Sequence, residues 1–132
     1  MCIVTERAEL LVPMSTTSPA AARAFVRASG CPAHNLKVLD DALLLITELI
    51  ANSIRHGGEP IVLTIECDEH SLIVRVRDGS TALPQPRVAT HSQENGRGLT
   101  LVDLLSDAWG VEPVRDDHGV GKAVWFRLRP SH

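Results

Sequence analysis

Residues 47–58 read TELIANSIRHGG and place two polar side chains, Glu48 and Asn52, four positions apart in an otherwise apolar segment. Four residues make slightly more than one turn of an α-helix, so both side chains would project from the same face. The apolar residues around them favour a helix that packs in a protein core. Burying an unpaired carboxylate and amide costs several kcal/mol, which indicates that a ligand, a metal ion or water satisfies them.

The polar residues of this helix form a stripe on a helical wheel. The stripe contains Asp41, Glu48, Asn52 and Arg55, the far side carries Leu43, Ile46, Ile50 and Ile54, and Leu44 and Leu45 flank the stripe. We expect the stripe to face a cleft whose other wall is also protein. Two alternatives remain open: Glu48 and Asn52 bond to neighbouring loops, or the stripe is the solvated face of an amphipathic helix.

Length, composition and charge limit the classes of protein to which this chain can belong. The chain has 132 residues, of which 44% are hydrophobic, and this suffices for a single domain (residues 1–132) with one core. The formal net charge is −3 and the basic residues are scattered, which argues against direct nucleic-acid binding. No apolar run approaches the roughly 20 residues that a membrane span needs, so no membrane association is expected.

The three cysteines, Cys2, Cys31 and Cys67, are far apart and form no Cys-x-x-Cys pair. We therefore expect free thiols rather than a zinc site or a redox motif. The N-terminus has no basic region followed by an apolar stretch and a cleavage site, and a cytoplasmic location is expected.

Changes of period and composition along the chain predict the order β-α-α-β-β-loop-α-β-β. β-branched residues indicate strands, caps and good helix formers indicate helices, and clusters of Gly, Pro and Ser indicate turns. The expected elements are a strand at 3–12, helices at 19–29 and from Asn35 to Arg55, strands at 60–67 and 71–77, a loop at 78–95, a helix that starts at Gly96-Arg97-Gly98, and a hairpin of 109–114 and 121–129. This order predicts an α+β fold with helices on one face of a mixed, mostly antiparallel sheet.

Asp78 continues the alternation of Leu72, Val74 and Val76 along one face of a strand. If helices cover that face, the carboxylate points inward, where it could accept a hydrogen bond from an exocyclic amine such as that of adenine. The alternative is an aspartate that only initiates the Asp78-Gly79 turn.

Gly96-Arg97-Gly98-Leu99 stands at the start of the third expected helix. Glycines let the backbone approach a ligand, and the free amides of a helix N-terminus favour phosphate. The loop at 79–95 is long enough to close over a nucleotide as a lid.

The segment His118-Gly119-Val120-Gly121-Lys122 has some likeness to the end of a P-loop. It lacks the required spacing and the Ser or Thr, and a strand rather than a helix is expected after it. We interpret it as a hairpin turn.

The combination of Glu48-x3-Asn52 on a helix, Asp78 after a strand and Gly96-x-Gly98 opening a later helix resembles the GHKL ATPase superfamily. That resemblance implies a two-layer α/β sandwich of the Bergerat type. The chain is similar in particular to single-domain anti-sigma-factor serine kinases of bacteria, over nearly its whole length.

The resemblance also implies an ATP and Mg²⁺ site and assigns roles to residues. Glu48 would be the general base that activates a serine hydroxyl on an antagonist protein, Asn52 would coordinate magnesium, and Asp78 would bind the adenine amino group. Gly96, Arg97 and Gly98, with Leu99 next to them, would wrap the phosphates, and Arg55 and His56 would lie where the helix end approaches the nucleotide. The implied partners are a sigma factor and its anti-sigma-factor antagonist, with homodimerisation as the family default.

Two departures from the family pattern concern the nucleotide. The superfamily usually has Asp-x-Gly, but Ser80 stands where that glycine is expected, and Ala123 follows Lys122 where a Thr or Ser is often found. Three other readings therefore stay open: a non-catalytic module of the same fold that sequesters a regulator, a histidine-kinase catalytic domain that acts on a separate protein, and an unrelated α+β protein with accidental matches. Glu48 and Asn52 favour the kinase.

Overall fold

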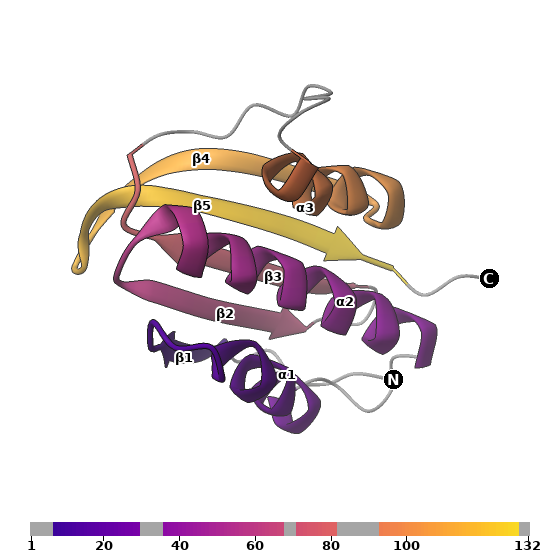
Figure 1. Cartoon of the computed structure of the whole chain (residues 1–132). Coiled ribbons are helices and arrows are strands. Elements are labelled where there is room, and N and C mark those ends of the chain that lie inside the picture. The colour runs from indigo at the N-terminus through magenta and orange to yellow at the C-terminus, as the bar shows by residue number, and fades with distance from the viewer. Residues whose placement is uncertain (1–6, 30–35, 68–70, 82–92, 130–132) are drawn as a thin grey trace.

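A computed structural model describes residues 7–29, 36–67, 71–81 and 93–129 (Figure 1). The elements are β1 (Ala8–Val12), α1 (Ser18–Ser29), α2 (Leu36–Asn52), the π-helical turn η1 (Ser53–Gly57), β2 (Ile61–Cys67), β3 (Leu72–Asp78), α3 (Gln93–Leu105), β4 (Ala108–Asp116) and β5 (Gly119–Leu128). Their order confirms the predicted α+β fold. The parts of the predicted elements at 3–6, 30–35, 68–70 and 82–92 lie outside the described residues.

The five strands form one sheet in the order β1-β2-β3-β5-β4, and each pairing is antiparallel. The sheet was expected to be mixed and mostly antiparallel; its described pairings include no parallel one. In Figure 1 the three helices lie on the same side of the sheet, with α2 across its middle. The structure is therefore a two-layer sandwich.

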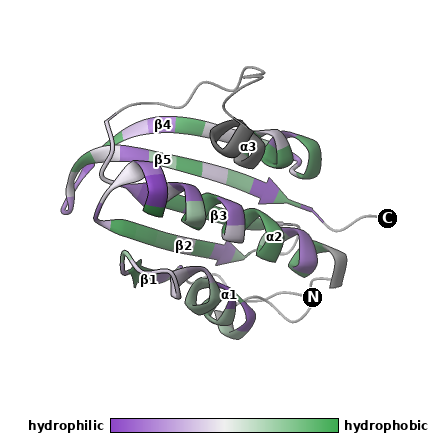
Figure 2. Cartoon of the chain, in the orientation of Figure 1, coloured by the Kyte–Doolittle hydropathy of each residue, from purple (hydrophilic) through white to green (hydrophobic). Residues whose placement is uncertain are grey.

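Alternation in β3 and β5 places their apolar side chains on the face that the helices cover, and β2 is apolar along most of its length (Figure 2). The fully or almost fully buried side chains include Val12, Ile61, Leu63, Ile65, Val74, Val76 and Phe126 of the sheet, and Ala22, Val26, Ala42, Leu45, Ile46, Ile50 and Val102 of the helices. Leu45 was expected to flank the polar stripe of α2, but it is buried, whereas Leu44 is exposed. The buried sector of α2 is thus rotated toward Leu45 and Leu49 relative to the expected one.

The end of the second helix differs from the prediction. The second helix was expected to run to Arg55; the α-helix ends at Asn52 and a π-helical turn continues to Gly57. Gly58 follows with φ of 121°, a backbone conformation that glycine adopts most easily, and the helical segment ends there.

The third helix starts earlier than predicted. It begins at Gln93, so Gly96, Arg97 and Gly98 lie inside the helix instead of opening it. Gln93 and Glu94 are good helix formers, and a glycine inside a helix costs only about 1 kcal/mol relative to alanine, so the two glycines weaken the helix without ending it.

Within the described ranges, no helix has both the length and the apolar character that crossing a membrane requires.

Candidate functional site

The Asp78 carboxylate lies at the end of β3, between the sheet and η1, and is almost completely buried. Its Oδ2 accepts hydrogen bonds from Ser53 Oγ at 2.9 Å and from Lys122 Nζ at 2.6 Å. Its Oδ1 accepts the backbone N–H of Ser80 at 3.0 Å. The prediction that this carboxylate points inward is therefore confirmed, and it is held by three donors from three separate parts of the chain.

The register of the sheet brings Lys122 to this carboxylate. Asp78 and Lys122 are directly opposite each other in the antiparallel pair β3–β5, on the helix-covered face that also carries Val76 and Val124. The lysine side chain is only 13% exposed. A charge pair this sheltered is screened much less than one on the surface.

Ser53 approaches from the helix layer, because it directly follows α2 as the first residue of the π-helical turn. π-helical turns add a residue to a helix and are frequent at functional sites. Ser53 is 5% exposed and its hydroxyl bonds to Asp78.

Two glycines let the surrounding backbone come close to Asp78. A Cβ atom on Gly57 would lie 2.3 Å from Asp78 Oδ2, and one on Gly121 would lie 2.0 Å from the Asp78 carbonyl oxygen. Both distances are far below ordinary van der Waals contact, so only glycine fits at either position without a shift of its neighbours.

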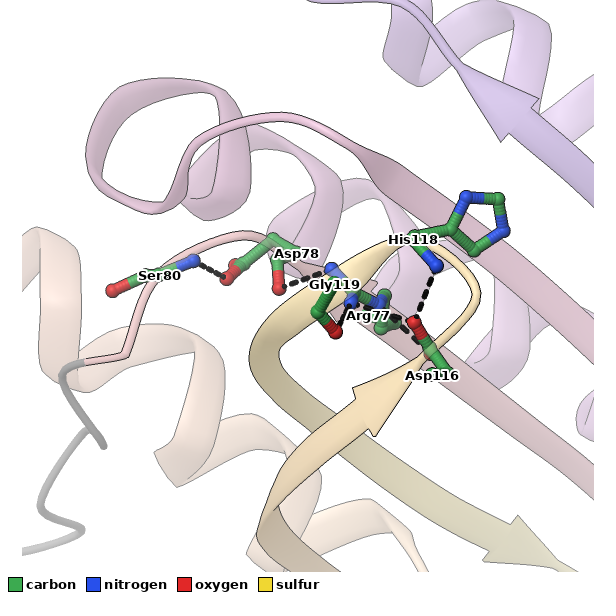
Figure 3. A network of polar contacts seen from close by, with 6 residues as sticks. All are labelled: Arg77, Asp78, Ser80, Asp116, His118 and Gly119. Atoms are coloured by element: carbon green, nitrogen blue, oxygen red, sulfur yellow. Dashed lines mark hydrogen bonds and ion pairs between the residues drawn. The ribbon is translucent and has the colours of Figure 1, made fainter.

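Arg77, the neighbour of Asp78, holds the β4–β5 hairpin against the end of β3 (Figure 3). Its side chain, on the helix-free face, donates to both carboxylate oxygens of Asp116, at 3.0 and 2.7 Å, and to the backbone oxygens of Asp78 and Gly119. The hydrogen bond from Arg77 is the main reason that the pKa of Asp116 falls from 3.8 to about 2, and the backbone N–H of His118 also lowers it. The network fixes the hairpin that carries Lys122.

The polar stripe of α2 is less deeply buried than the sequence suggested. Glu48 and Asn52 are both partly buried, and the fully buried polar side chain of this region is Ser53. Asn52 Oδ1 accepts a hydrogen bond from Arg55 at 3.2 Å, so two predicted site residues are in contact. Because Ser53 follows Asn52 directly, the Ser53–Asp78 bond places this end of α2 beside Asp78.

The other predicted site residues are less closely connected. Arg55 and His56 are exposed. Leu99 is 4% exposed and packs in the core, so a contact with a ligand would fall to its backbone. Positions 96–98 are helical, and their side-chain surroundings lie outside the described part of the chain.

Sequence reasoning missed Ser53 and gave Lys122 no place in the site. Both were accessible in principle: alternation along β5 puts Lys122 on the same face as Val124 and Phe126, and Ser53 is adjacent to the Asn52 that was singled out. The pairing of Lys122 with Asp78 depends on the strand register, which alternation alone does not provide.

The arrangement brings together a buried carboxylate and an ammonium that bond to each other, at the end of a helix that carries a second carboxylate and an amide. Comparison with known proteins identifies the family. Residues 14–128 match the family model described as "Histidine kinase-like ATPase domain". A curated relative is the signal transduction histidine-protein kinase AfsQ2 of Streptomyces coelicolor, 30% identical over 99 residues, an alignment that covers 65% of this chain and 18% of that protein. The chain thus belongs to the histidine kinase-like ATPase domain family.

Proposed function

We propose that the chain binds ATP with Mg²⁺ between the end of α2 and the end of β3, and that it is a regulatory protein kinase of the anti-sigma type. The observation that carries the nucleotide site is the inward Asp78 carboxylate, which is buried beside glycines at positions 57 and 121 and linked through Ser53 to the helix that bears Glu48 and Asn52. The family model, which describes an ATPase domain, supports this reading.

Each polar group has a distinct part in the proposal. Asp78 accepts a hydrogen bond from the amino group of adenine, and Asn52 supplies an oxygen ligand to magnesium. Within the described ranges, no group of three or more His, Cys, Asp and Glu side chains is close enough to hold a metal ion. A magnesium ion here would therefore take most of its ligands from phosphates and water, as it commonly does, and would neutralise phosphate charge.

Glu48 is the proposed general base. Phosphoryl transfer asks the protein chiefly for positioning and charge neutralisation, together with a carboxylate near the incoming hydroxyl. Glu48 lies on α2 one turn before Asn52 and is partly buried, so a carboxylate stands close to the proposed phosphate end of the site. The proposed acceptor is a serine of an antagonist protein, and a sigma factor is the proposed target of sequestration.

A second candidate function is sequestration of a regulator without phosphoryl transfer. It is favoured by one observation: the carboxylate proposed to bind adenine already holds Ser53, Lys122 and the Ser80 amide. A weak nucleotide site would leave protein binding as the main activity.

Calorimetric titration with ATP, with and without Mg²⁺, tests the nucleotide site directly. Magnesium-dependent binding supports it, and the absence of detectable heat at millimolar ATP would leave the sequestering module as the better reading.

Transfer is tested with γ-labelled ATP and a bacterial lysate as the source of acceptors. The native chain should add label that Glu48→Ala does not, while Glu48→Ala still binds Mg-ATP. Glu9→Ala, on the edge strand β1, is the matched control and should transfer like the native chain. Acid-stable label indicates phosphoserine, whereas acid-labile label indicates phosphohistidine and would favour the histidine-kinase reading. Equal loss of binding and transfer in Glu48→Ala would contradict the general-base role.

A further inference from the structure

The carboxylate of Asp78 has little acceptor capacity left for a ligand. Oδ2 accepts from both Ser53 and Lys122, which uses its two lone pairs, and Oδ1 accepts from the Ser80 amide, so three of the roughly four acceptor positions of the carboxylate are taken. We propose that Lys122 is an internal competitor for Asp78, so that the native chain gains little affinity from the amino group of adenine. This inference rests on the proposed nucleotide site.

The competitor is built into the sheet. Lys122 reaches Asp78 because the two residues are directly opposite in the β3–β5 pair, and the hairpin that carries Lys122 is fixed by Arg77 through Asp116 and Gly119. The Nζ–Oδ2 distance of 2.6 Å is slightly shorter than the roughly 2.7–2.9 Å usual for a charge-assisted N–H···O hydrogen bond. The ammonium is thus positioned before any ligand arrives.

The exchange of one donor for the other is unfavourable. Both donors form a charge-assisted hydrogen bond with the Asp78 carboxylate, but the Lys122 ammonium adds the attraction of a full positive charge, whereas the amino group of adenine is neutral. An adenine amino group that took the place of Lys122 on Oδ2 would replace the stronger donor with the weaker one, and the sheltered ammonium would lose its partner. Lys122 therefore sets base selectivity: while it stays on Asp78, a purine with the amino group has little advantage over one without it.

The test compares ATP with purine riboside triphosphate, which lacks the 6-amino group, on the native chain and on Lys122→Met. We expect the native chain to bind the two nucleotides within about twofold of each other, and Lys122→Met to prefer ATP by about tenfold. The ratio is informative because Lys122→Met also removes one positive charge from the protein, and that loss affects two nucleotides of equal charge alike. Thermal unfolding checks that the variant is folded.

Arg115→Met is the matched control, since it removes one positive charge from an exposed position on the same hairpin. It should leave the ratio at the native value. Should Lys122→Met fail to fold, Lys122→Thr provides the same comparison, and the native ratio needs no variant at all. A tenfold preference for ATP in the native chain, or a ratio that Lys122→Met leaves unchanged, overturns the proposal.

Absolute affinities separate this inference from the proposed function. Native binding with a tenfold ATP preference keeps the nucleotide site and rejects the competitor. Binding of ATP by Lys122→Met but not by the native chain supports the competitor and rejects ATP binding by the native chain. If neither protein binds either nucleotide at millimolar concentration, both proposals fail.

Discussion

Asp78 and Lys122 face each other across the antiparallel strands β3 and β5, with Nζ 2.6 Å from Oδ2 and both side chains largely shielded from solvent. Opposite charges in such surroundings depend on each other more than surface pairs do, because each would be left uncompensated without its partner. The pair therefore contributes to the stability of the fold and also lies at the proposed adenine site.

A double-mutant cycle should reveal this dependence. Asp78→Asn leaves the Lys122 ammonium sheltered and unpaired, and we expect it to lower the free energy of unfolding by about 2–4 kcal/mol. Asp78→Asn combined with Lys122→Met should lose clearly less than the sum of the single changes. Urea denaturation of the four proteins gives the coupling energy.

The exposed pair Arg75–Glu112, at 2.7 Å, is the control for the cycle. Its side chains are 32% and 48% exposed, so the coupling energy should stay below about 1 kcal/mol. Equal coupling in the two pairs would show that burial adds nothing to the Asp78–Lys122 contact.

Much of this architecture is predictable from local pattern. Alternation in β3 correctly indicates that Asp78 points inward, because Leu72, Val74 and Val76 need a covered face. The hairpin after residue 108 also follows from β-branched residues and turn chemistry, but its turn is shorter than predicted, since Gly119 to Lys122 belong to β5 and only residues 117 and 118 form the turn. These features depend on near neighbours in the sequence.

The contacts of the site are less predictable because they are long-range. Ser53 meets Asp78 across 25 residues of sequence, and Lys122 meets Asp78 only in one strand register. No single-sequence pattern specifies either. The burial of Arg77 on the helix-free face also depends on long-range contacts, since it requires Asp116 and the Gly119 carbonyl from a hairpin about 40 residues later.

The Arg77–Asp116 pair predicts an acid-dependent loss of stability. The folded pKa of Asp116 is lowered to about 2 from 3.8, so its contribution is complete above the unfolded value and disappears as pH falls from about 4 to 2. Since the Asp116 side chain is 41% exposed, solvent screening reduces the contribution to about 1 kcal/mol. Urea denaturation of the native chain and Asp116→Asn at pH 6, 4 and 3 measures it.

The stability difference between these two proteins should narrow as the pH falls, because protonation makes the native side chain neutral like asparagine. Other carboxylates titrate in both proteins and cancel in the difference. A difference that stays constant from pH 6 to 3 would mean that the lowered pKa of Asp116 does not contribute to stability.

Gly57 and Asp78 offer a steric test of the same site. Gly57 does not have a positive φ, so alanine is acceptable to its backbone, but the added Cβ would lie 2.3 Å from Oδ2 and 2.6 Å from Cγ of Asp78. The carboxylate cannot move away freely, because three donors hold it. We expect Gly57→Ala to lower the free energy of unfolding by about 1–3 kcal/mol, the usual range for overpacking.

In an Asp78→Ala background both colliding atoms are absent, and the same change should cost less than about 1 kcal/mol. Gly58→Ala is the control: its Cβ would meet nothing within 4 Å, but φ of 121° strains any other residue, so its cost should be the same in both backgrounds. If Gly57→Ala also costs the same in both backgrounds, the close approach of η1 to the Asp78 carboxylate is not what requires glycine at position 57.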